Sequence, residues 1–195
     1  FAQNDKAKLY LKESCSENCY DRKEGKMKYI GIKRGMLEKY RDRIIRVPGD
    51  LEISAGVRLI SHSKESMKKA GEREHMYLKE GNDWVPDCFT HEQSLVFETE
   101  SGIVIFNSCS HGGADNIINE VSAVFPGRQI HAMIGGFHLY NKSEEYVRSF
   151  AEKVRATGVE KIYTGHCTGE EGYRILCEVL GDRVHQLEAG LEIVL

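Results

Sequence analysis

The sequence predicts an α/β layered fold in one domain. From Ser94 onward, short apolar runs alternate with segments whose apolar residues recur at helical spacing, which is the pattern of strands and helices packed in layers. Before Ser94, single apolar residues alternate with polar ones, as in half-buried strands. A chain of 195 residues can bury a sizeable core but sits at the upper end of one ordinary domain, so we expect a single domain over residues 1–195.

The first half reads as short strands joined by loops. Alternation predicts strands in KAKLYLK (6–12), YIGIK (29–33), RIIRV (43–47) and ISAGVRLIS (53–61). Two charged stretches, residues 16–28 and 63–75, are interpreted as solvated loops. The second stretch has an alternative interpretation as a mobile lid over a pocket entrance.

The second half alternates strand and helix. It opens with a predicted hairpin over residues 95–109 that turns at Ser101 and Gly102. Two further strands are expected at 130–137 and 161–165, and closing strands within 184–195. Three helices are predicted from apolar residues at helical spacing, which are Ile117, Ile118, Val121 and Phe125 in the first, Tyr146, Val147, Phe150, Ala151 and Val154 in the second, and Tyr173, Leu176, Cys177 and Leu180 in the third.

Charge and hydropathy narrow the function classes. The net charge is −3 with both signs interspersed, so the chain lacks the basic face on which non-specific nucleic-acid binding depends, and a small-molecule partner is the better expectation. We expect no membrane partner, because no apolar run is long enough to cross a bilayer. With no secretory signal pattern at the start, the sequence predicts a cytoplasmic protein.

The six cysteines are spaced without the paired framework of disulfide-rich secreted proteins, so we expect them to be reduced. Cys15 and Cys19 are the closest pair. Because the sequence suggests no partners for a zinc site there, they are interpreted as part of a surface loop. Cys109, two residues before His111, is interpreted as a small packing residue.

Three histidines carry the strongest chemical signal. His111, His138 and His166 each follow an apolar strand, at intervals of one strand and one helix. They are therefore expected at equivalent ends of strands that run in the same direction, where ligands bind in open α/β sheets. Any one of them alone is more often a structural residue, but three at one register predict a shared metal site, since imidazole is a common ligand for zinc, manganese or iron.

Residues around the histidines are expected to support the same site. Glu92 is interpreted either as a carboxylate that orients an imidazole or as a charge at a strand edge. Ser110 and Thr168 directly adjoin the strand-end segments and are expected to hold the ligands in place or to contact substrate.

Helices are predicted to begin just after the histidines. Thr168 with Glu171 matches a capping box, and Asn141 with Glu144 resembles one. Helix N-termini that point toward the site would favour an anionic substrate.

The segments FNSCSHGGADNII, AMIGGFHL and TGHCTGEEGY together closely resemble the C-terminal motifs of one branch of the metallo-β-lactamase superfamily, that of the dihydropterin-methyl-ribofuranosyl-aminobenzene phosphate synthase-like proteins. The resemblance is strong from Asp87 to the end and weaker upstream. It implies the αβ/βα sandwich of that superfamily and one or two divalent metal ions, with zinc expected first and manganese or iron as alternatives.

The resemblance also implies roles for the histidines. His111 and His166 match the superfamily's third and last metal motifs. His138 occupies the position where a bridging aspartate is usual, and a neutral imidazole does not bridge two cations as a carboxylate does. All three are expected to be ligands.

The first superfamily motif, His-x-His-x-Asp-His, does not occur in this sequence. We therefore expect the fold to be incomplete at its N-terminus, with the water-handling aspartate upstream of Phe1 and the chain inactive alone. Association with that segment, or with a second copy of the chain, is expected. The implied activity is hydrolysis of an ester or phosphoester of a small anionic metabolite, or transfer chemistry on a pterin diphosphate.

Two alternatives remain open. One is a non-catalytic binding or regulatory protein that retains the fold without the first metal motif. The other is a redox protein with two irons beside a flavin, which needs further carboxylate ligands and a flavin domain that the sequence does not contain.

Overall fold

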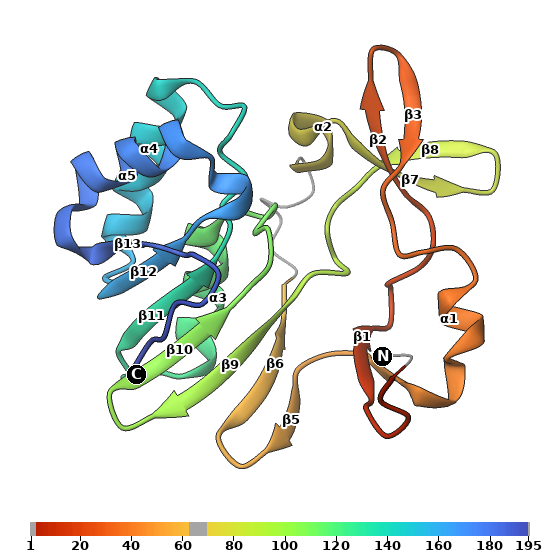
Figure 1. Ribbon diagram of the computed structural model, residues 1–195, viewed down its shortest axis with the longest axis horizontal. Helices are drawn as coiled ribbons and strands as arrows, with labels where there is room; N and C mark the ends of the chain where they lie inside the picture. The colour runs from red at the N-terminus through yellow and green to blue at the C-terminus, as the bar shows by residue number, and fades with distance from the viewer. Residues whose placement is uncertain (1–2, 63–69, 195) are drawn as a thin grey trace.

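The computed structural model describes residues 3–62 and 70–194. Figure 1 shows a larger β-region with long helices packed beside it, and a smaller β-region. The larger region is a seven-stranded sheet in the order β13-β12-β11-β10-β9-β6-β5. Its strands are β5 (Leu51–Ser54), β6 (Val57–Ser61), β9 (Gln93–Thr99), β10 (Gly102–Phe106), β11 (Ile130–Gly135), β12 (Lys161–Thr164) and β13 (Val184–Gln186). The strands from β10 to β13 run parallel, and β9 is antiparallel to β10.

The main core lies between this sheet and the helices α3 (Ala114–Val124), α4 (Glu144–Ala156) and α5 (Glu170–Leu180). Ile105, Met133 and Ile162 are fully buried in the core that also includes the apolar residues of the helices. Val104 and Ala132 belong to a separate apolar cluster, because successive side chains of a strand point to opposite faces of the sheet. The sheet is therefore apolar on both faces.

The smaller region is a four-stranded sheet in the order β3-β2-β7-β8. Its strands are β2 (Cys19–Lys23), β3 (Lys26–Tyr29), β7 (Met76–Glu80) and β8 (Asp83–Pro86), and a separate parallel pair joins β1 (Leu9–Lys12) to β4 (Ile44–Val47). The remaining helical segments are short and comprise α1 (Met36–Lys39), η1 (Arg41–Arg43), α2 (Ala70–Glu74), η3 (His166–Thr168) and η4 (Gly181–Arg183). Helix α2 packs against β7 and β8.

The second half of the chain confirms the expected order of hairpin, helix and strand. The hairpin of β9 and β10 turns next to Gly102, and the three predicted helices are present with most of their predicted apolar residues buried. The expectation of several closing strands was wrong, because residues 187–194 form no strand after β13.

The first half differs more. The charged stretch 16–28 is not a solvated loop but contains β2 and most of β3, which turn at Glu24 and Gly25, both with positive φ. The strand β2 was not predicted because it pairs with β7, which lies far along the chain, as well as with β3. The expectation of a strand at 29–33 was wrong, because β3 ends at Tyr29 and residues 30–33 form no strand. In the stretch 63–75, residues 63–69, and with them most of the proposed lid, lie outside the described residues, while 70–74 form α2.

Both predicted capping boxes were wrong. Ser143 caps α4, because its extended backbone lets its hydroxyl accept a hydrogen bond from the amide of Tyr146. Gly169 precedes α5, and no side chain caps the N-terminus of that helix. The Thr168 hydroxyl instead hydrogen-bonds with the amide of Phe137 and the hydroxyl of Thr164. In the described part of the chain, no helix is sufficiently long and apolar to span a membrane.

Candidate metal centre

Three loops at one edge of the large sheet bear the predicted ligands. Strands β10, β11 and β12 are parallel neighbours, so the loops that follow them leave the sheet at the same edge. His111 lies on the loop after β10, His138 on the loop after β11, and His166 opens η3 directly after β12. The register predicted from the sequence is therefore present in the fold.

Each of these loops contains a residue in the left-handed region that is not glycine. The φ angles are 51° for Ser110, 51° for His138 and 53° for His166. An L-residue pays about 1–2 kcal/mol for this conformation, so the surrounding structure must hold each of the three in place. Such residues are concentrated at functional sites.

His111 is fixed from both sides. Its Nδ1 lies 2.6 Å from Glu92 Oε1, and its backbone amide donates to the same carboxylate oxygen at 3.2 Å. The ring stacks on Phe89, with centroids 4.6 Å apart and 10° between the planes. Burial is the largest single influence and disfavours both charges of the pair, but their hydrogen bond and mutual charge attraction together outweigh it, so the pKa of Glu92 is lowered and that of His111 is raised. Glu92 thus makes the contact that its interpretation as an orienting carboxylate requires, and it leaves Nε2 of His111 for a ligand.

His138 lies beside His111, with ring centroids 4.7 Å apart. Its Nε2 lies 3.5 Å from Oε2 of Glu74, which is itself bound to Lys142 Nζ at 2.6 Å. Its Nδ1 is buried and has no hydrogen-bond partner among the described residues. Burial, followed by the nearby charge of His111, lowers the pKa of His138 to about 4, so the ring is neutral at neutral pH. A neutral imidazole with an unpartnered buried nitrogen is suited to bind a metal ion.

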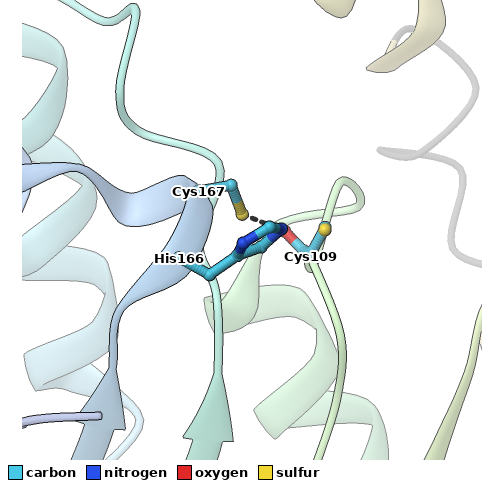
Figure 2. Close-up of side chains that lie close together, drawn as sticks. All are labelled: Cys109, His166 and Cys167. Atoms are coloured by element: carbon cyan, nitrogen blue, oxygen red, sulfur yellow. Dashed lines mark hydrogen bonds between the residues drawn. The ribbon is translucent and has the colours of Figure 1, made fainter. Parts of the chain in front are cut away.

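His166 belongs to a neighbouring group with Cys109 and Cys167, shown in Figure 2. One ligand atom from each of the three lies within 4.8 Å of the others. The Cys167 thiol points across to the loop of Cys109, where its Sγ is 3.9 Å from the Cys109 carbonyl oxygen. The hydrogen bond with Cys167 is the main cause that lowers the pKa of Cys109, to about 5, and it raises the pKa of Cys167.

The two groups adjoin. The charges of both His111 and His166 act on the Cys109 thiol, and the backbone amide of His138 donates to Cys167 Sγ at 3.3 Å. Cys109 is partly exposed and is a member of this group, so its interpretation as a packing residue was wrong. The shared three-histidine site itself stays a prediction, because in the described ranges His166 is grouped with the two cysteines.

Ser110 and Thr168 hold the loops together from inside the protein. Ser110 is buried, and both its amide and its hydroxyl donate to Oδ1 of Asn107. Thr168 is fully buried; its Oγ1 accepts from the amide of Phe137 at 3.0 Å and lies 2.6 Å from Thr164 Oγ1. Thr168 therefore ties the loop of His138 to that of His166.

Sequence reasoning missed Glu74 and the cysteine pair. Glu74 reaches His138 from α2, a segment with no detectable apolar pattern. The cysteines had a signal, because each lies within two residues of a predicted ligand. The available donors are the imidazoles, of which that of His138 is neutral, a carboxylate and a thiol of lowered pKa, and this set fits a divalent ion such as zinc.

Comparison with solved structures identifies the fold. A crystal structure described as a metal-dependent hydrolase of the β-lactamase superfamily aligns over 96% of this chain and 71% of that chain, with a TM-score of 0.81 and 22% sequence identity. A metallo-β-lactamase from Erythrobacter litoralis aligns over 63% of this chain and 46% of its own, with 12% identity and a TM-score of only 0.30. The protein has the metallo-β-lactamase fold, as the sequence predicted.

The resemblance to a particular branch is also confirmed. The chain is 32% identical over 115 residues to the 7,8-dihydropterin-6-methyl-4-(β-D-ribofuranosyl)-aminobenzene-5′-phosphate synthase of Methanocaldococcus jannaschii. The match spans 59% of this chain and 39% of the length of that relative. No family model matches the sequence.

Proposed function

We propose that this protein is a metal-dependent hydrolase that acts on an ester or phosphoester of a small anionic metabolite. In this proposal His111, His138 and His166 are metal ligands, with Cys109 and Cys167 beside them. The observation that carries it is the pairing of His111 with Glu92 next to His138, whose buried Nδ1 lacks a partner among the described residues. A carboxylate behind a ligating histidine is the usual arrangement in metal sites.

A bound divalent ion, with zinc expected before manganese or iron, would lower the pKa of a water molecule and stabilise developing negative charge. The chain's own residues would prepare the site. Glu92 fixes the tautomer and orientation of His111, and Phe89 covers one face of that ring. Lys142 holds Glu74 beside His138.

Positive charge near His111 supports an anionic substrate. Arg73 donates to the backbone carbonyl of His111 at 2.9 Å and lines a cavity of about 120 Å³. Lys153 and the backbone of Gly112 and Gly113, just before α3, line the same cavity. The two cations beside a helix start suit a phosphate or carboxylate, although Asp115 partly offsets them and the amides of Gly112 and Gly113 are already bonded to Glu92 and Ser110.

The name of the Methanocaldococcus relative supports a pterin-related substrate within this proposal. Transfer chemistry on such a substrate would use the same donors, and product analysis separates transfer from hydrolysis. Because the match spans 39% of the relative, the whole protein's activity is part of the proposal. Residence in the cytoplasm stays a prediction from the sequence.

Metal content tests the proposal. We expect the purified protein to contain zinc, manganese or iron by elemental analysis, and we expect His111→Ala and His166→Ala each to reduce it. The matched control is His185→Ala, because His185 stacks on Tyr163 outside the metal centre. Full metal retention in both site variants would mean that these histidines are structural. Because this chain is expected to be inactive alone, turnover is measured on protein that also carries the His-x-His-x-Asp-His segment, and metal binding without turnover of a phosphoester by that protein would support the non-catalytic alternative.

A further inference from the structure

A second group of metal-binding side chains lies beside the small sheet. Cys19 opens β2, Asp87 directly follows β8, and His91 lies on the loop that leads to β9. One ligand atom from each lies within 4.8 Å of the other two. The cluster thus joins two segments that are far apart in sequence, because Asp87 and His91 lie on one loop and Cys19 lies on β2, so no spacing pattern in the sequence predicted it.

The cluster is held in place before any ion binds. Asp87 is 2% exposed, and its Oδ1 accepts a hydrogen bond from the amide of Phe89 at 2.7 Å. Its Oδ2 lies 3.0 Å from Nε2 of His91, and the His91 side chain also hydrogen-bonds with Cys19. A cavity of about 270 Å³ opens beside these side chains, and Cys15 forms part of its wall.

We propose that Cys19, Asp87 and His91 bind a zinc ion, with the fourth position facing the cavity that Cys15 lines. Its three ligands are different residues from those of the centre of His111 and His138, although His111 lines the same cavity, and the site does not depend on the proposed hydrolase activity.

The donor set and its spacing favour zinc over other biological cations. Thiolate and imidazole are the preferred ligands of zinc, whereas magnesium and calcium take oxygen ligands. Two ligands bound at about 2.0–2.3 Å in a tetrahedron lie about 3.3–3.8 Å apart, so the observed cluster needs only a small adjustment to close around an ion.

The position of the cluster gives the ion a structural role. It would fasten the first residue of β2 and the end of β8 to the loop before β9, and so join the small sheet to the large one. Phe89, whose amide is bound by Asp87, stacks on His111. Zinc bound to Asp87 would therefore also fix the position of Phe89, which covers one face of the His111 ring.

Cobalt titration tests the site. The experiment uses Cys109→Ser/Cys167→Ser protein, so that thiols of the neighbouring group give no signal. We expect Co²⁺ to produce a thiolate charge-transfer band and the intense visible bands of tetrahedral cobalt, and Zn²⁺ to abolish both. Cys19→Ser in this background should remove the charge-transfer band and weaken binding at least about tenfold. Cys88→Ser is the matched control, because Cys88 lies next to Asp87 but its thiol contacts Thr90.

A second measurement needs no substitution. Zinc should protect Cys19, but not Cys88, from alkylation in the wild-type protein, as read by peptide mass spectrometry. The proposal is overturned if the cobalt spectrum is the same with and without Cys19, or if zinc leaves the alkylation of Cys19 unchanged. Either result would mean that the three side chains form a hydrogen-bonded cluster without a metal.

Discussion

Replacing Glu92 by alanine removes the carboxylate that holds His111. The carboxylate accepts from Nδ1 and the backbone amide of His111, and from the amide of Gly112 at 3.4 Å. Loss of such a partner typically lowers metal affinity about 10–100-fold, which corresponds to about 1.4–2.7 kcal/mol. We expect a loss of this size for zinc at the centre of His111 and His138, and a smaller loss for Glu92→Gln, which keeps an acceptor oxygen.

The assay is a competition titration with a chromogenic zinc chelator. The matched control is Glu160→Ala. It breaks a similar contact, between Glu160 and Nδ1 of His131 at 2.8 Å. His131 lies near the start of β11, at the end of the strand opposite the loop of His138. This control should bind zinc as the wild type does. If folded Glu92→Ala protein keeps wild-type zinc affinity, His111 is not a ligand that Glu92 supports.

The same substitution has a pH signature in metal-free protein. Glu92 has its folded pKa below the ordinary 4.5, so its contribution is present above pH 4.5 and is lost as the pH falls. His111 has its folded pKa above the ordinary 6.5, so its contribution is present below pH 6.5 and is lost as the pH rises. The difference in unfolding free energy between wild type and Glu92→Ala should therefore be largest between pH 4.5 and 6.5, as measured by urea unfolding. A difference that does not vary with pH would contradict the ion pair.

Three further predictions concern the core, a thiol and an ion pair. Leu176→Ala removes a fully buried side chain and should cost about 2–5 kcal/mol in urea unfolding; a loss below about 1 kcal/mol would contradict the packing. At pH 6.5 iodoacetamide should modify Cys109, whose pKa is lowered to about 5, before Cys15, whose pKa is raised mainly by burial, as mass spectrometry would show; the reverse order would contradict this. Burial raises the pKa of Glu74, but hydrogen bonds led by that of Lys142 outweigh burial and lower it. Lys142→Met should therefore cost about 1–3 kcal/mol at pH 7, and the cost should shrink as the pH falls below 4.5, the ordinary value of the carboxyl; an unchanged cost in acid would refute the pairing.

The sequence predicted those parts of the fold that local patterns determine. Strands β10 and β11 are buried and mainly apolar, β12 alternates buried with half-buried residues, and α3 to α5 carry apolar stripes, so each could be predicted from its own segment. The small sheet could not be predicted from local pattern, because its charged strand β2 pairs with the distant β7, and β3 joins the sheet through β2. Local patterns therefore predicted the large sheet and its helices but not the small sheet.

The candidate metal centre shows the same division. Register along successive strands predicted where His111, His138 and His166 would lie, because parallel strands present their ends at one edge. Register could not show which donors meet, since that depends on the path of each loop. Glu74, which contacts His138, lies on α2. His166 lies in a separate group with Cys109 and Cys167.

The backbone of the three loops gives an independent reason to expect function there. Glycine would adopt the left-handed conformation at positions 110, 138 and 166 without strain, yet the sequence has Ser110, His138 and His166. For Ser110 the hydrogen bonds to Asn107 explain the choice, since they fix the turn just before His111. The side chain of His166 is exposed, so packing does not explain why histidine rather than glycine has this strained backbone conformation. A ligand that binds the imidazole would offset the strain, which is why the backbone favours a metal centre at this edge over a purely structural role for the histidines.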